Sequence, residues 1–208
     1  MAQQPEEQYT APLIRSAEID DLDTLVDTLS DAFAHDPVFN WLFPDTELYA
    51  ELFRLILSSN SLPKGMVHLE QNGRGAAVWL PPDCPFDLAL SFDLLALVAR
   101  CLWRMGPGTI KRLRQQSSLF DQQKPSQAHF HLQFIGCRQR DQGQGIGAKL
   151  LQQGTRTCDA LQSPAYLECS SELNLPLYER HGFVIRDETK LPKGGPRVWF
   201  MWREAQNN

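Results

Sequence analysis

The stretch QGQGIG, residues 142–147, places three glycines at alternate positions between an extended apolar segment and a helical run. An extended run, Phe130–Cys137, precedes it, and a helical run, Ala148–Gln153, follows it. Because glycine has no Cβ atom, such a loop tolerates positive φ angles and lets a ligand approach its backbone closely. Its N–H groups would point outward at the start of a helix, where the dipole favours negative charge. The stretch therefore predicts a loop that cradles a pyrophosphate group.

The composition restricts the kinds of partner that this loop serves. The 208 residues carry a formal net charge of −5 and are 42% hydrophobic, which is ordinary for a soluble globular protein. We expect no nucleic-acid partner, because no general basic surface is implied. We also expect no membrane partner, because the longest apolar run, Leu88–Val98, is too short to span a bilayer.

The cysteines and the first residues indicate where the protein works. Five cysteines are odd in number and lack a CxxC spacing, which argues against a disulfide framework or a zinc site. The polar N-terminus has neither the basic nor the apolar region of a secretory signal. We therefore expect a cytoplasmic protein, a monomer or homodimer, that needs no metal.

Hydrophobic spacing predicts one α/β domain over residues 12–204 with a mixed sheet, after a disordered tail at residues 1–11. The predicted strands are Leu13–Arg15, Met66–Glu70, Ala76–Leu80, Phe130–Cys137, Tyr166–Cys169, Phe183–Thr189 and Arg197–Arg203. The predicted helices start at Asp20 or Asp21 and run to Phe33, then cover Glu47–Ser58, Asp87–Trp103, Thr109–Gln116, the run after the glycine loop to Leu161, and Leu175–His181.

The glycine loop has three other interpretations: a dinucleotide-binding loop, a Walker loop and a plain tight turn. Gly143, Gly145 and Ala148 fit a dinucleotide-binding pattern, and Glu168 lies where a ribose-binding acid could follow. Against this, five residues separate the strand from the loop, and the downstream strands are short and antiparallel in character. A Walker loop is excluded because no Gly-Lys-Ser/Thr follows. The plainest alternative is a tight turn that packs a helix on a strand.

The strand and loop together resemble the acetyl-CoA-binding motif of the GNAT-type N-acetyltransferases, Arg/Gln-x-x-Gly-x-Gly/Ala. Gln142, Gly145 and Gly147 stand at its defined positions. A second block, Leu167–Phe183, is similar to the last strand–helix–strand of this superfamily, and Gly195–Met201 resembles the C-terminus of puromycin N-acetyltransferases. The proline usual after the strand is Gln139 here, so the path to the loop lacks a rigid turn.

The resemblance implies a GNAT-like fold, a mostly antiparallel sheet with splayed central strands and flanking helices. It implies that acetyl-CoA donates an acetyl group to a primary amine, preferably of a small molecule, by direct attack in a ternary complex. The main chain of Phe134, Ile135 and Cys137 would pair with the pantetheine arm as an added strand does. The diphosphate would lie on the loop residues Gln142, Gly143, Gln144, Gly145, Ile146, Gly147 and Ala148.

Two polar residues of the second block are candidates for the reaction. Asn174 and Tyr178 are four apart and therefore share a helix face. The resemblance implies that Tyr178 protonates the CoA sulfur and that Asn174 bonds to the cofactor. From the residues alone, Tyr178 could equally pack on the sheet, and Asn174 could cap the helix.

The proton acceptor stays open among His129, His131, Glu168 and water. His129, His131 and Gln133 alternate with Phe130, Leu132 and Phe134, which predicts a strand with one polar and one apolar face. The acceptor should enter opposite the cofactor, against aromatic side chains of the N-terminal half (Phe33, Phe39, Trp41, Phe43 and Trp79). An amine cation could be attracted by the acidic residues Asp31, Asp36, Asp45 and Glu51. Two rival functions are a non-catalytic acyl-CoA-binding module of the same fold and a dinucleotide enzyme.

Overall fold

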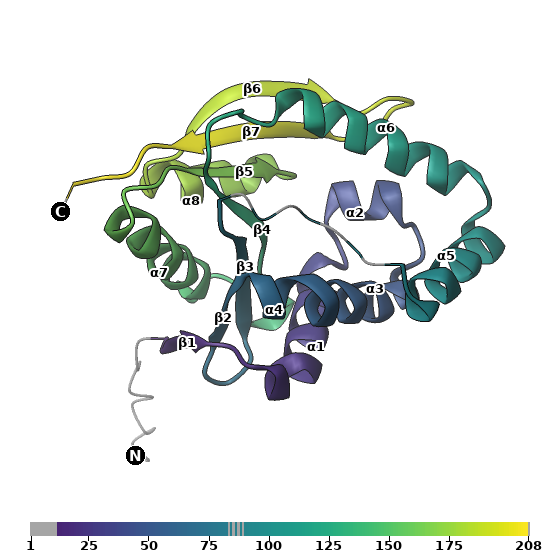
Figure 1. Cartoon of the computed structure of the whole chain (residues 1–208), viewed down its shortest axis with the longest axis horizontal. Coiled ribbons are helices and arrows are strands. Elements are labelled where there is room, and N and C mark those ends of the chain that lie inside the picture. Colours follow the sequence, from purple (N-terminus) through teal and green to yellow (C-terminus); the bar gives the residue numbers. More distant parts are fainter. Residues whose placement is uncertain (1–11, 83, 85, 87, 89, 208) are drawn as a thin grey trace, which may run out of the picture.

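The computed structural model describes residues 12–207 except 83, 85, 87 and 89, so the predicted tail lies outside the described residues. One seven-stranded sheet forms its centre, in the order β1-β2-β3-β4-β5-β7-β6 (Figure 1). All neighbouring strands are antiparallel except β4 and β5, which are parallel. The strands are β1 Ile14–Ser16, β2 Met66–Glu70, β3 Gly75–Leu80, β4 Phe130–Cys137, β5 Ala165–Cys169, β6 Val184–Lys190 and β7 Arg197–Arg203.

Helices cover both faces of the sheet. The α-helices are α1 Leu22–Phe33, α2 Pro37–Leu42, α3 Tyr49–Ile56, α4 Leu62–Lys64, α5 Phe92–Met105, α6 Gly108–Gln123, α7 Ile146–Ala160 and α8 Leu175–Arg180. Short 3-10 turns are η1 Ile19–Asp21, η2 Thr46–Leu48, η4 Gln139–Asp141 and η5 Glu172–Asn174, and η3 Leu57–Ser61 is a π-helical turn. No helix of the described part is both long and apolar enough to cross a membrane.

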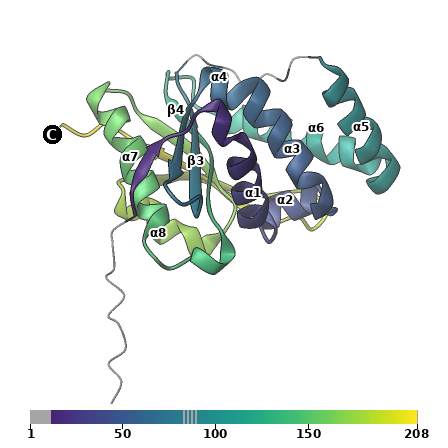
Figure 2. The same cartoon turned by 90° about the horizontal axis from the view of Figure 1, so that it is seen from below.

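The sheet separates two apolar cores. Figure 2 shows α7 and α8 on one side of the central strands and α1 and α3 on the other. Trp79 is fully buried beneath α7, where a Cβ atom on Gly154 would lie only 2.3 Å from the indole ring, so the helix can approach only with glycine there. On the opposite face, Phe39, Phe53 and Phe134 stack edge and face within 6.0 Å between ring centroids. Both cores hold β3 and β4 rigidly in the middle of the molecule.

Several predicted boundaries move for local reasons. The predicted Asp87–Trp103 helix begins at Phe92, because the Ser91 hydroxyl accepts a hydrogen bond from the Leu94 N–H and caps it there. The basic helix extends to Gln123. The helix α2 was not predicted, although Asp36 caps it and Pro37 stands at its first position. Asp21 does not cap α1 through its side chain, which instead binds Arg15 and the Glu18 N–H.

A β-bulge in β4 corrects the prediction of one polar and one apolar strand face. Val78 of β3 pairs with Phe134 and Trp79 pairs with Leu132, so Gln133 is left without a partner. Such an extra residue reverses the alternation beyond it. Leu132 therefore packs in the core under α7, whereas Phe134 packs in the opposite core. The polar face, with His131, ends at the bulge.

Candidate active site

The parallel strands β4 and β5 separate near their middle. Their paired residues are Phe130 with Ala165, His131 with Tyr166, and Leu132 with Leu167, and the ladder ends there although both strands continue. In the described part of the chain, β4 has no strand partner on this side from Gln133 onward. The result is an open strand edge inside the sheet.

The direction of the main-chain groups on this edge follows from strand alternation. The Arg138 N–H donates to the Arg74 carbonyl of the β3 side at 2.8 Å. Because successive residues of a strand direct their N–H groups to opposite sides, those of Ile135 and Cys137 point to the open edge. By the same alternation the N–H of Phe134 points to β3, and its side chain is buried among aromatic rings.

The 3-10 turn η4 joins this edge to the glycine loop. Gly143 and Gly145 have φ angles of 76° and 77°, the left-handed region in which glycine carries no steric cost. Gly145 precedes α7, whose first-turn N–H groups have no acceptor within the helix. The side chain of Ile146 is buried, and the Gly147 N–H faces the Cys137 sulfur. Burial nevertheless raises the pKa of the Cys137 thiol to about 11, so it is a neutral group beneath the loop.

An ion pair from the β2–β3 hairpin reaches this loop. Glu70 is 1% exposed, and its carboxylate accepts hydrogen bonds from the Asn72 N–H at 2.9 Å and the Arg74 guanidinium at 2.7 Å. The same guanidinium donates to the Gln144 side chain at 3.3 Å. Arg138 ties the end of β4 to the hairpin through the Gly73 carbonyl at 2.8 Å. The sequence prediction missed Glu70 and Arg74 as site residues, although it predicted the strands Met66–Glu70 and Ala76–Leu80 on either side of this turn.

Tyr178 lies beside the separation of the strands. It is 6% exposed and packs in the core under α7 with Phe183. Its hydroxyl makes no hydrogen bond within the described residues. Burial raises the pKa of Tyr178, and the charges of Cys169 and Asp36 raise it further. Asn174 precedes α8 but makes no side-chain cap hydrogen bond and is exposed. Its amide is therefore available to a ligand.

The opposite face of β5 carries a row of polar side chains. The Nε2 atom of His131 lies 2.7 Å from the Oε2 atom of Glu168, and the two groups form a hydrogen bond. Burial alone would raise the pKa of the Glu168 carboxyl, but the charge and hydrogen bond of His131 outweigh it, and the pKa is lowered. His129 is buried, its Nδ1 lies 2.6 Å from the Gln127 carbonyl, and burial lowers its pKa. His131 and Glu168 thus meet where the strands begin to separate.

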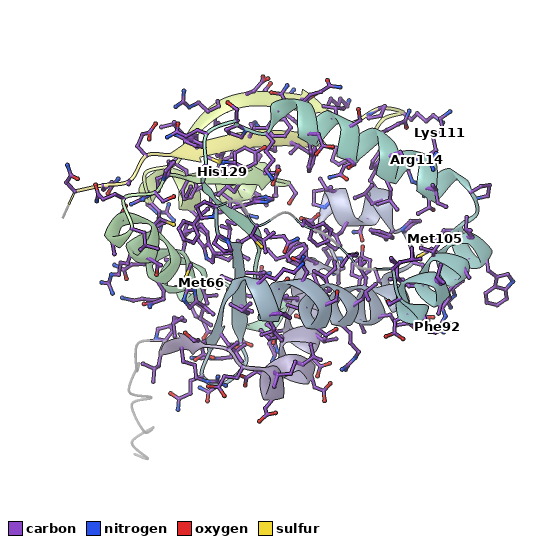
Figure 3. The ribbon with its side chains drawn as sticks, viewed as in Figure 1. Met66, Phe92, Met105, Lys111, Arg114 and His129 are labelled. Carbon is purple, nitrogen blue, oxygen red and sulfur yellow. The ribbon has the colours of Figure 1, made fainter. Side chains whose placement is uncertain are left out.

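A cavity of about 240 Å³ adjoins this pair. Figure 3 labels His129, which lines it at the start of β4. The lining also includes His131 and Lys124, with Pro81, Cys84 and the segment Pro125–Ala128. The cavity thus has imidazole and ammonium groups on a wall of mixed polar and apolar residues.

Most of the residues predicted to face the acceptor amine lie in the cores or in ion pairs. Trp79 is wrong as an acceptor surface, because it is fully buried under α7 on the other face of the sheet. Phe33, Phe39 and Phe43 belong to or border the core under α1 and α3, and Trp41 packs near Gly195. Asp45 and Glu51 are engaged by Arg104 and Arg100, and Asp31 accepts the Gln139 N–H at 2.7 Å.

Asp36 alone among the predicted acids lies at the site. Its Oδ1 accepts the N–H groups of Val38 and Phe39 at 2.9 and 2.8 Å, and its Oδ2 accepts a hydrogen bond from Ser170. Ser170 follows β5, two residues beyond Glu168. Burial raises the pKa of Asp36, although these hydrogen bonds oppose the shift.

Comparisons with known proteins agree with this geometry. A Schizosaccharomyces pombe protein described as an uncharacterized N-acetyltransferase is 28% identical over 188 residues, covering 82% of this chain and 74% of its own. The likeness extends well beyond the C-terminal motif region. The chain is thus similar over most of its length to a protein described as an N-acetyltransferase. No family model matches the sequence.

Solved structures share the GNAT fold along almost the whole chain. A Corynebacterium glutamicum protein described as histone acetyltransferase HPA2 and related acetyltransferase aligns with a TM-score of 0.69 at 23% identity, covering 96% of this chain and 99% of its own. Arylalkylamine N-acetyltransferase 2 from Aedes aegypti aligns with a TM-score of 0.62 at 12% identity, covering 95% and 100%. The predicted GNAT-like fold is confirmed, whereas the likeness to puromycin N-acetyltransferases stays a prediction.

Proposed function

We propose that this protein transfers the acetyl group of acetyl-CoA directly to the primary amine of a small molecule. The observation that supports this most is the open edge of β4, which continues into a loop of outward N–H groups. Coenzyme A has the matching chemistry, an amide-rich linear arm joined to a diphosphate. The arm pairs with Ile135 and Cys137, and the diphosphate meets the N–H groups from Gly143 to Ala148.

In the ternary complex, the amine nitrogen attacks the thioester carbon, and the carbon–sulfur bond then breaks. The Ile135 or Cys137 N–H stabilises the charge on the carbonyl oxygen. Tyr178 gives its proton to the departing thiolate. The pKa of Tyr178 is raised in the free protein, which makes the phenol a weaker acid, so the transfer depends on negative charge developing on a sulfur held beside the hydroxyl.

The acceptor amine approaches from the face that carries the polar row of β5. Asp36 attracts the ammonium form, and His131, oriented by Glu168, takes the proton that the amine must lose. The nitrogen loses its second proton after attack, and this proton replaces the one that Tyr178 gives to sulfur. The products are the amide, the CoA thiol and one proton held by His131. The cavity of about 240 Å³ beside His131 favours a small acceptor over a folded protein surface.

Calorimetry tests the cofactor assignment. Acetyl-CoA should bind and NAD should not, and Gly145→Ala should weaken acetyl-CoA by at least about tenfold because the loop needs a left-handed residue. Gly194→Ala is the matched control, since Gly194 has the same φ of 77° in a distant turn with open space around it. Tight binding of NAD, or equal affinity in both variants, would overturn the assignment.

An amine-library assay for released thiol then separates an enzyme from a binding module. Turnover with a small primary amine supports the proposal. Acetyl-CoA binding with no turnover on any amine favours a non-catalytic acyl-CoA-binding module. Turnover confined to peptide N-termini would contradict the proposal that the acceptor is a small molecule.

A further inference from the structure

The outer face of α5 is apolar and has no partner among the described residues. α5 and α6 project from the end of the molecule opposite α7 (Figures 1 and 2). The inner side of α5 packs on α3 through Leu97 and Cys101. Leu94 and Met105 are partly buried beside them. The remaining apolar side chains are exposed and form the α5 face, which consists of Phe92, Leu95, Ala96, Val98, Ala99, Leu102 and Trp103. At 100° per residue they form an uncharged arc of roughly 160°.

The charged residues of α5 lie outside this arc and are largely neutralised. Arg100 pairs with Glu51, and Arg104 pairs with Asp45 and Glu47. These ion pairs hold α5 against the neighbouring α3 region, so the apolar face is fixed in its outward direction. Figure 3 marks the two ends of the helix with Phe92 and Met105.

The size of the α5 face is that of a protein interface. Phe92 is 91% exposed and Trp103 is 84% exposed. Because an aromatic side chain carries roughly 150–250 Å², these two alone expose roughly 300–400 Å². Leu95, Val98 and Leu102 add to it at 52%, 39% and 37% exposure. The total exceeds what most monomers expose and approaches the roughly 800 Å² per partner of a stable dimer.

The sequence of the face is complementary to itself. In an antiparallel helix pair with a two-fold axis between positions 97 and 98, Phe92 lies opposite Trp103 of the second copy. The same axis places Ala96 opposite Ala99, so two small residues meet at the crossing point and let the helices approach closely. Large side chains then close both ends of the contact.

We infer that the α5 face joins two copies of this chain into an antiparallel, two-fold symmetric dimer. A lipid surface is the other occupant that an apolar helix face could suit. The net charge of −5 disfavours an anionic bilayer, and the arginines that border the face are already paired. A second copy, in contrast, brings the same uncharged surface to both sides.

Sedimentation velocity over the micromolar range tests this dimer. The full chain should be a dimer, and Phe92→Ser with Trp103→Ser should raise the dissociation constant by at least about 100-fold, since large aromatic residues dominate interface energies. Leu161→Ser, at a 63% exposed position on the far side of the molecule, should leave it unchanged. Acetyl-CoA binding reports that each variant is folded, because α5 lies outside the proposed cofactor site. A monomeric wild-type chain would overturn the inference.

Cross-linking tests the geometry of the pair. A mixture of the Ala96→Cys and Ala99→Cys variants should form a disulfide-linked dimer under mild oxidation, while either variant alone should not. Equal cross-linking of each single variant would contradict the two-fold axis. Co-sedimentation of a monomeric chain with phosphatidylcholine–phosphatidylglycerol vesicles, lost in the double serine variant, would identify lipid as the occupant and overturn the dimer.

Discussion

Tyr178 has the position that the proposed proton donor needs. It is buried beside the separation of β4 and β5, although burial raises its pKa and so weakens it as an acid. Its hydroxyl also makes no hydrogen bond within the described residues, so a ligand atom can become its partner. His131 has polar surroundings instead, because its Nε2 lies 2.7 Å from a carboxylate oxygen of Glu168.

Tyr178→Phe should lower kcat by about 100-fold while the dissociation constant of acetyl-CoA changes less than about twofold. The reason is that the hydroxyl acts on sulfur only as the thioester breaks, while the ring still fills the core. Steady-state kinetics with calorimetry checks this. Unchanged kcat across the pH range would remove Tyr178 from its proposed role.

His131→Gln should lower kcat/KM by about 10- to 100-fold at neutral pH. The loss should shrink as the pH approaches the pKa of the free amine. At high pH the amine is already neutral and needs no protein base. His129→Gln serves as the comparison, because His129 is already bonded to the Gln127 carbonyl. An equal loss at every pH would indicate a structural role for His131.

At the scale of elements, the β2–β3 hairpin supports the glycine loop. The buried Glu70 carboxylate holds Arg74, and Arg74 holds the side chain of Gln144. Charged hydrogen bonds of this kind fix geometry more firmly than neutral ones. The hairpin therefore positions the loop without needing to touch the cofactor.

Arg74→Met should raise the dissociation constant of acetyl-CoA by roughly tenfold, since a charged hydrogen bond to the loop is lost. KM for the amine should change little, because the amine enters on another face. Calorimetry and amine titrations measure the two effects. A matched weakening of both substrates would point to general unfolding instead of loop disorder.

The sequence predicted elements where local signals were strong. β4 and β7 have the predicted bounds, because each is a run rich in apolar and aromatic residues between polar segments. α2 escaped prediction because it has only six residues and a weak periodicity. The bulge at Gln133 and the burial of Trp79 depend on pairing with distant strands, which no local pattern encodes. The pairs of His131 with Glu168 and of Asp36 with Ser170 likewise arise only from tertiary packing.

At the scale of the whole molecule, buried histidines link stability to pH. Burial lowers the pKa of His68, which is 3% exposed, and also that of His129. In the unfolded chain both would titrate near pH 6.5. The unfolded state therefore binds more protons as the pH falls below that value, and the folded state loses stability.

The urea midpoint should fall as the pH is lowered from neutral toward pH 5, and His68→Gln should flatten this dependence. His35→Gln is the control, because His35 is exposed. Equilibrium urea unfolding at several pH values measures the slope. A dependence of equal steepness in wild type and His68→Gln would show that His68 does not contribute to it.

The central claim is that acetyl-CoA occupies the open edge of β4 and the loop before α7. Amide hydrogen exchange followed by NMR, with and without acetyl-CoA, tests it residue by residue. With acetyl-CoA bound, exchange should slow at Ile135, at Cys137, from Gly143 to Ile146 and at Ala148, because these N–H groups gain acceptors. Gly147 is left out because its N–H already faces the Cys137 sulfur. Protection elsewhere with no change at these amides would contradict it.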